Sequence, residues 1–202
     1  MEITVDALRW ALTATLKAAS KDPVRHALCG VCFERPEADE DAPIPIRAGM
    51  LRLIGTDGHR LHVADIAALG DLALPARGVT LDRAACERLL KALPKTGKKG
   101  PAPSVDLAFR DDAAHARIGA DTLLIPVLAE RFPDWRQVVP TIPAKAPAER
   151  MGFDPDYLAA ACAVAPGGCL QIHTPEDLSP MLLTSQNPDL GMFTAVVMPM
   201  RI

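Results

Sequence analysis

Three short stretches of alternating apolar and polar residues, each followed by an alanine-rich segment with helical periodicity, form the clearest pattern in the chain. They lie at residues 3–6, 79–82 and 151–154. Alternation is typical of a short strand, and the Asp that ends each stretch is typical of a helix N-cap, because its carboxylate accepts the first free amide hydrogens. The spacing from the first stretch to the second nearly equals that from the second to the third, so we predict an internal repeat of three modules.

Further strand candidates follow each predicted helix. Two of them are joined by Asp57-Gly58, a dipeptide typical of a two-residue hairpin turn, because both residues tolerate positive φ. Each module is therefore predicted as β-α-β-β-β, an α+β fold with antiparallel sheets. The later strands are predicted at residues 26–34, 50–56, 59–66, 105–110, 114–118, 122–127, 169–173, 181–185 and 192–197, and the third helix at residues 154–165.

The first two predicted helices carry an apolar stripe and a basic stripe. The apolar positions are Leu8, Leu12, Leu16, Leu89 and Leu93. The basic positions are Arg9, Lys17, Lys21, Arg88, Lys91 and Lys95. The third helix has no basic residue. Taken alone, a charged stripe is typical of an ordinary solvated helix face.

The last eight residues form an apolar, strand-like run that contains a proline between two methionines. Pro199 has no amide hydrogen to donate to a sheet, so we expect the last four residues to leave regular pairing. This would place Met198 and Met200 near the surface, where flexible thioethers suit a groove that accepts several apolar ligands. The alternative is an ordinary last strand with a frayed end.

Composition narrows the class of protein. The chain has 202 residues, 49% of them hydrophobic, and 22 basic against 25 acidic residues give a net charge of -3. This balance argues against holding nucleic acid by bulk electrostatics. The 19 prolines gather in regions expected to be loops, and five cysteines without a signal peptide suggest a reducing cytoplasm. No stretch has the roughly twenty consecutive apolar residues that span a membrane.

Three patterns suggest other chemistry, and each has a simpler interpretation. Asp57 and His59 lack a nearby nucleophile or orienting group, so turn formation is favoured over acid–base catalysis. Cys29 and Cys32 resemble half of a zinc or redox site, but the other cysteines have the wrong spacing for a second half. The run at residues 95–98 lacks the upstream glycine of a phosphate loop. We therefore expect no enzymatic activity, catalytic residue, metal or cofactor.

Five segments together resemble the bacterial beta sliding clamp family, the processivity subunit of the replicative DNA polymerase III, in a shortened form. The most specific are Thr-Asp-Gly-His-Arg-Leu at residues 56–61 and Met-Pro-Met-Arg at residues 198–201. All five occur in the family's order, at residues 25–34, 56–61, 131–136, 179–183 and 196–202. The resemblance implies the DNA-clamp fold, in which helices line the inner face of a ring and antiparallel sheets form its outer face.

The resemblance also implies two functional surfaces. DNA replication partners of the family, including DNA polymerase, dock a short peptide in an apolar pocket between two domains. The matching positions are Leu28, Thr56, Gly58, His59, Arg60, Leu61, Pro133, Val138, Val196, Val197, Met198, Pro199, Met200 and Arg201. The basic stripe becomes a DNA-facing lining, where weak phosphate contacts permit sliding. Gln137 stands where a basic residue is common, which changes the charge of the pocket rim.

The family comparison implies domain boundaries and an assembly. Residues 1–139 resemble the middle clamp domain, with modules at 1–70 and 71–139, and residues 151–202 resemble the second half of the last domain. Residues 140–150 are expected to be a proline-rich linker. Twelve modules close the family's ring, so three per chain predict a homotetramer built through a repeated head-to-tail contact. A ring of another size or an open assembly is an alternative.

The expected partners follow from this assignment. They are double-stranded DNA held topologically and without sequence specificity, DNA polymerase and other proteins with clamp-binding motifs, further copies of the chain, and a clamp loader, with no membrane. The alternative function is a clamp-like interaction module or decoy that binds clamp partners without encircling DNA.

Overall fold

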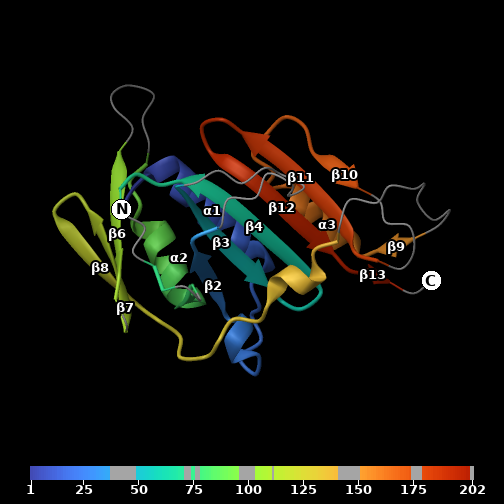
Figure 1. Ribbon diagram of the computed structural model, residues 1–202, viewed down its shortest axis with the longest axis horizontal. Helices are drawn as coiled ribbons and strands as arrows, with labels where there is room; N and C mark the ends of the chain where they lie inside the picture. The colour runs from blue at the N-terminus through green and yellow to red at the C-terminus, as the bar shows by residue number, and fades with distance from the viewer. Residues whose placement is uncertain are drawn as a thin grey trace.

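The computed structural model describes residues 1–36, 49–70, 74–75, 78–95, 103–110, 112–140, 151–173 and 179–200. Within these residues the predicted order of elements occurs three times (Figure 1). The first module contains β1 (Glu2–Thr4), α1 (Val5–Ala18), β2 (Gly30–Glu34), β3 (Met50–Thr56) and β4 (Arg60–Ala67). The second contains β5 (Val79–Asp82), α2 (Arg83–Ala92), β6 (Ser104–Phe109), β7 (Ala113–Ile118) and β8 (Asp121–Pro126). The third contains β9 (Gly152–Phe153), α3 (Pro155–Cys162), β10 (Gln171–His173), β11 (Met181–Asn187), β12 (Gly191–Val197) and β13 (Pro199–Met200).

Most predicted strands are confirmed to within a residue or two at each end. The exception is the predicted strand 26–34, whose first residues form a 3-10 turn (η1, His26–Leu28), so that β2 starts at Gly30. The third helix ends at Cys162, earlier than the predicted end at residue 165. The extra residues predicted as helix run toward Pro166, a residue that cannot continue a helix.

The helix starts agree with two of the three predicted N-caps. The carboxylates of Asp82 and Asp154 accept an amide hydrogen bond in the first turn of α2 and α3. In α1 the cap is Thr4, whose Oγ1 accepts from the Ala7 amide at 3.4 Å, so the prediction of Asp6 is wrong. The helix already includes Asp6 in its first turn, where a carboxylate is favoured by the helix dipole.

The opening strands of the first two modules are exchanged. β1 pairs antiparallel with β6 in the sheet β1-β6-β7-β8, and β5 pairs antiparallel with β2. Ile3 lies opposite Val105, and Leu81 lies opposite Val31. Each module therefore completes the sheet of the other, and α1 packs against α2 between them.

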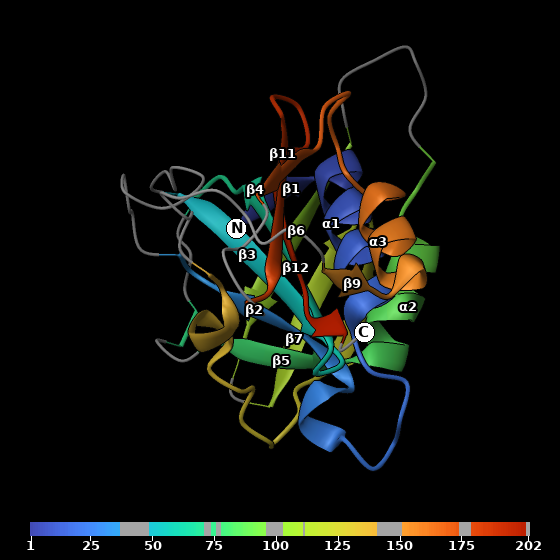
Figure 2. The same ribbon diagram turned by 90° about the vertical axis from the view of Figure 1, so that its right-hand side faces the viewer.

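The third module joins the first through their last strands. β12 pairs antiparallel with β4, which gives a seven-stranded sheet in the order β10-β11-β12-β4-β3-β2-β5. The modules consequently lie in a row with the first in the middle (Figure 1). The three helices lie together on one side of the molecule (Figure 2), and α1 lies between α2 and α3 (Figure 1).

Hydrophobic clusters fill both sides of this sheet. The largest packs α1 and α2 against the sheets and includes the predicted apolar stripe, with Leu8, Leu12 and Leu89 fully buried. A second cluster joins α3 to β11 and β12, and a third contains Leu61, Val196 and Phe132. The row of modules is thus held by side-chain packing as well as by strand pairing.

The C-terminal run partly follows its prediction. Pro199 ends the pairing of β12 with its neighbours, as expected from the missing amide hydrogen. The residues after it do not leave strand pairing, however, because Pro199 lies opposite Phe153 and Met200 lies opposite Gly152. The short β13 therefore forms its own two-stranded sheet with β9.

Candidate partner-peptide and DNA surfaces

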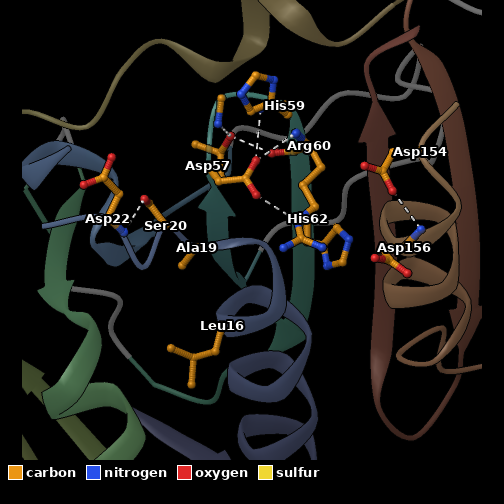
Figure 3. Close-up of polar contacts among 12 residues, drawn as sticks. Leu16, Ala19, Ser20, Asp22, Asp57, His59, Arg60, His62, Asp154 and Asp156 are labelled. Atoms are coloured by element: carbon orange, nitrogen blue, oxygen red, sulfur yellow. Dashed lines mark hydrogen bonds and ion pairs between the residues drawn. The ribbon is translucent and has the colours of Figure 1, made fainter. Parts of the chain in front are cut away.

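The hairpin between β3 and β4 is held by a dense set of hydrogen bonds (Figure 3). Asp57 Oδ1 accepts from the amides of His59 and Arg60 at 3.0 and 3.1 Å, and Oδ2 pairs with Arg60 Nε at 3.0 Å. Thr56 Oγ1 accepts from the Gly58 amide at 3.1 Å. The loop consists of residues 57–59 and only Gly58 has positive φ (+92°), so the predicted two-residue turn is wrong. The side chain of Asp57 takes over the turn hydrogen bonds.

Tyr157 of α3 brings the third module against this hairpin. Its ring stacks on His59 at a centroid distance of 6.4 Å, and the Arg60 guanidinium lies 4.6 Å from its centroid. The Met198 amide donates to the His59 carbonyl at 3.0 Å. Sequence reasoning missed Tyr157, although it is the one tyrosine of the chain and lies on a helix without a basic residue. The hairpin and the C-terminal segment thus form one composite surface.

The paired strands β4 and β12 direct neighbouring site residues to opposite faces of the sheet. Leu61 lies opposite Val196, and both pack with Phe132 on one face. Val197 packs with Ala161 of α3 on the other face and is fully buried. Adjacent strand residues alternate between faces, so Val197 supports the site from behind and contributes no accessible surface.

The segment after β8 is fixed across the sheet by an aromatic and ionic cluster. Arg136 pairs with Glu34 at 2.7 Å, and the Trp135 indole Nε1 lies 3.5 Å from the same carboxylate. The guanidinium groups of Arg52 and Arg136 lie 5.2 and 4.6 Å from the Trp135 ring centroid. These contacts hold Phe132 over the sheet, where it is buried.

The remaining predicted site residues differ in accessibility. Val138 and Met200 expose 39% and 53% of their surface, and Pro133 is also exposed. Leu28, Met198 and Pro199 are partly buried, and Arg201 lies outside the described residues. Gln137 donates to the Asp134 carboxylate at 3.1 Å. The accessible apolar side chains are therefore those on the segment after β8 and at the C-terminal end.

Five of the six predicted DNA-facing residues have exposed side chains on or directly after α1 and α2. They are Lys17, Lys21, Arg88, Lys91 and Lys95. Both helices lie on the side of the molecule opposite the large sheet (Figure 2). On α3 the charged residue of the helix is Asp156, so the basic surface belongs to the first two modules.

Arg9, the sixth residue, caps a helix. Its guanidinium Nη2 donates to the carbonyl oxygens of Leu93 and Pro94, both at 2.8 Å, at the end of α2. The reciprocal contact comes from Arg83, whose Nη1 donates to Leu16 and Ala19 at the end of α1 at 2.8 and 2.9 Å. Cations at helix C-termini satisfy free carbonyl groups and oppose the dipole. Arg9 therefore also fixes α1 against α2.

A cavity of about 790 Å³ lies between α1 and the chain after α3. Its lining includes Arg9, Trp10, Thr13, Val164 and Asp189, and none of the predicted partner-peptide residues. The Trp10 indole donates to the Val164 carbonyl at 2.8 Å. The cavity is thus distinct from the predicted peptide surface.

Of the cysteine pair, expected to be buried in one strand, Cys32 lies in β2, whereas Cys29 precedes the strand and is partly exposed. Cys32 is buried, and burial raises the pKa of its thiol to about 12, while the Cys29 Sγ donates to the Asp22 carbonyl at 2.9 Å. In the part of the chain that is described, no three His, Cys, Asp or Glu residues gather as metal ligands.

No described helix is long and apolar enough to cross a membrane. Residues 96–98 of the run compared with a phosphate loop lie outside the described residues.

Comparisons with known proteins converge on one group. No family model matches the chain. The beta sliding clamp of Proteus mirabilis is 27% identical over 138 residues, which cover 68% of this chain and 33% of that protein. The chain therefore spans about a third of the length of this curated relative.

Solved structures give the same result over the full length of the chain. Caulobacter crescentus pol III beta matches with a TM-score of 0.79 and 21% identity, covering 100% of this chain and 65% of that one. The DNA polymerase III beta subunit of Thermotoga maritima matches with a TM-score of 0.75, 15% identity and the same coverage. A Pseudomonas aeruginosa sliding clamp solved with griselimycin has a TM-score of 0.74 and 19% identity, again at 100% and 65% coverage. The resemblance inferred from the sequence is thereby confirmed: this chain has the α+β DNA-clamp fold and is similar to bacterial beta sliding clamps, at a shorter length.

Proposed function

We propose that the chain is a DNA sliding clamp, a processivity factor that encircles double-stranded DNA as a homo-oligomeric ring. The observation that carries the proposal is the common side of the three helices, on which five basic residues are exposed on or directly after α1 and α2. A net charge of -3 is compatible with this role, because a topological link to DNA needs only weak, sequence-independent phosphate contacts.

The proposal includes a partner site at the composite surface defined by the β3–β4 hairpin, Tyr157, Met198 and Met200. The exposed Met200 and the partly exposed Met198, beside the satisfied polar groups of the hairpin, suit a short peptide with apolar anchors. DNA polymerase and other proteins with clamp-binding motifs are the proposed partners, and a clamp loader would open the ring. The role is non-enzymatic, without a cofactor, and cytoplasmic.

A loading assay on circular DNA tests encirclement. A ring placed on nicked circular DNA should remain bound during gel filtration in moderate salt and should be lost when the circle is linearised. Replacing Lys17, Arg88 and Lys91 by glutamate should reduce retention, because each exposed cation contributes to phosphate attraction. The control is Arg110→Glu, an exposed position after β6 outside the helices, which should leave retention unchanged. Equal retention on circular and linear DNA would contradict encirclement.

The second candidate is a clamp-like module or decoy that binds clamp partners without encircling DNA. It is favoured by α3, which carries Asp156 and no basic residue, so part of the helical side offers phosphates no attraction. Such a module should bind a clamp-binding peptide while showing no difference between circular and linear DNA.

The assembly proposed for a ring is a homotetramer, since four copies of three modules supply the twelve of the family's rings. Mass measurement in solution tests this number. A monomer at working concentration would contradict every ring.

A further inference from the structure

The third module has two strand edges that the described residues leave without a partner. β10 is the last strand of the seven-stranded sheet, with β11 on its inner side. β9 pairs with β13 alone. Free edges carry unpaired amide and carbonyl groups that readily accept another strand.

The first two modules show what normally occupies these edges. Each of their opening strands has two neighbours. On one side is the chain just after the last strand of the same module: Glu2 and Leu69 exchange two hydrogen bonds of 2.8 Å, and Leu81 forms a bridge with Val127. On the other side is the first sheet strand of the companion module, which is β6 for β1 and β2 for β5.

The third module reproduces the first of these contacts and lacks the second. Its opening strand β9 pairs with β13, which directly follows the last sheet strand β12. The other side of β9 and the outer side of β10 are the two edges that a companion module would fill. The third module is thus built as half of a pair.

The missing half is not inserted between the second and third modules. Residues 140–150 are all that separates them, and this segment is far shorter than either of the modules at 1–70 and 71–139. A third-module copy from another chain carries both complementary edges, because an arrangement with two-fold symmetry places β9 of each copy beside β10 of the other.

The internal pairing also fixes the register of such a contact. Ile3 lies opposite Val105, and Leu81 lies opposite Val31. In each case the residue before the N-cap of the helix faces the second residue of the companion strand. The equivalent positions in the third module are Phe153 and Ile172.

Burial supports this assignment. Val31 and Val105, which face the opening strands of the companion modules, are fully buried, whereas Ile172 exposes 57% of its surface. On α3 the buried residue is Ala161, whereas α1 buries nine of its fourteen residues and α2 three of its ten. The third module therefore retains uncovered apolar surface where the first two modules cover theirs.

We propose that the third modules of two copies complete each other as an isologous pair, with Phe153 of each copy opposite Ile172 of the other. This deepens the self-association of the proposed clamp, yet it rests on the module geometry and does not require DNA. A head-to-tail contact would bring the free edge of β8 in one copy against the third module of another. Because that edge supplies no opening strand to pair with β10, the isologous pair replaces the expected head-to-tail contact.

One hydrogen bond of the internal pair would be absent from this contact. The first helical amides of α1 and α2, from Val5 and Arg83, donate to the carbonyls of Pro103 and Cys29 at 2.8 and 3.0 Å. Pro155 occupies that position in α3 and has no amide hydrogen. The proposed pair therefore depends on strand pairing and apolar contact.

Cysteine cross-linking between distinguishable chains tests the register. Cys162 and Cys169, which are exposed, are first replaced by serine. A tagged Phe153→Cys chain is then mixed with an untagged Ile172→Cys chain under mild oxidation. Residues opposite each other on antiparallel strands are close enough for a disulfide, so the mixture should give about tenfold more linked dimer than either variant alone. Equal yields in all three samples would overturn the register.

Sedimentation of the full chain tests the contact without cysteines. Ile172→Asp should raise the dissociation constant of the self-associated form at least about tenfold, since it places a charge in an apolar strand contact. Val24→Asp is the matched control, because Val24 is an exposed apolar residue (81%) outside the third module. An unchanged dissociation constant for Ile172→Asp would refute the pairing. If residues 153 and 172 form the cross-link but the chain is not retained on circular DNA, the clamp function is refuted and the proposed pairing still holds.

Discussion

Val196 of β12 lies directly opposite Leu61 of β4, although the two residues belong to the third and the first module and lie far apart in the sequence. This pair joins the sheets of the first and third modules, and both side chains pack against Phe132. The hairpin that follows β3 consequently lies beside the segment that follows β12. The proposed peptide surface therefore exists only when the two modules are docked.

Truncating the C-terminal methionines should weaken a clamp-binding peptide. Met198→Ala with Met200→Ala removes flexible apolar surface from the proposed groove, and we expect a loss of roughly five- to tenfold in affinity. Fluorescence anisotropy with a labelled peptide measures it. Met192→Ala, at the opposite end of β12, is the control and should bind normally. Unchanged affinity of the double variant would place the peptide site elsewhere.

The contact between Arg60 and Tyr157 should couple the hairpin to α3. The guanidinium lies 4.6 Å from the ring centroid, and such contacts contribute about 0.5–1 kcal/mol at accessible sites. A double-mutant cycle with alanine at both positions, followed by urea unfolding, should give a coupling of this size. The cycle of Arg117 with Tyr157 is the control, since Arg117 lies on β7 in the other sheet. Zero coupling in the first cycle would refute the contact.

The buried pair of Arg52 and Asp65 should dominate the polar contribution to stability. Its two hydrogen bonds are 2.6 and 2.8 Å long, and the side chains are 7% and 6% exposed. Asp65→Ala leaves the buried guanidinium of Arg52 with one neighbouring carboxylate, that of Glu34, whose Oε1 lies 3.9 Å from Nη1. We expect a loss of about 3 kcal/mol in the free energy of unfolding.

The exposed pair of Arg117 and Asp106 provides the comparison for this prediction. Its side chains are 66% and 42% exposed, so Arg117→Ala should cost less than about 1 kcal/mol, because water screens the pair. Chemical denaturation of both variants measures the difference. Equal losses in the free energy of unfolding would show that burial does not increase the contribution of the Arg52–Asp65 pair to stability.

His62 should make the protein less stable in mild acid. Its Nδ1 lies 2.8 Å from the Ala14 carbonyl, its Nε2 has no partner among the described residues, and burial lowers its pKa from 6.5 to about 4. Between these values the unfolded chain binds a proton that the folded protein does not. Stability is therefore fully present above pH 6.5 and falls as the pH approaches 4, by up to about 3 kcal/mol.

A substitution isolates this contribution. His62→Asn places a neutral amide donor near the position of Nδ1, toward the Ala14 carbonyl, and removes the titrating group. Urea unfolding between pH 7 and pH 4.5 should show a smaller loss of stability for this variant than for the unmodified protein. The same pH dependence in both would assign the acid sensitivity to other groups.

The elements and their threefold order could be predicted from the sequence, because strand alternation, helix periodicity and N-capping depend on residues close together in the chain. The apolar stripe with Leu8 and Leu89 and the cap at Asp154 are examples. It also carried the resemblance to sliding clamps, through motifs such as residues 56–61.

Which strands pair and which faces remain free depends on long-range packing. Nothing local marks β1 as a partner of β6, because a short apolar strand fits either sheet until long-range packing selects one. The same packing buried Val197 behind the proposed site, placed Tyr157 against the hairpin and turned Arg9 into a helix cap. Burial and hydrogen bonding to distant residues set these outcomes, so they became visible only when the modules were assembled.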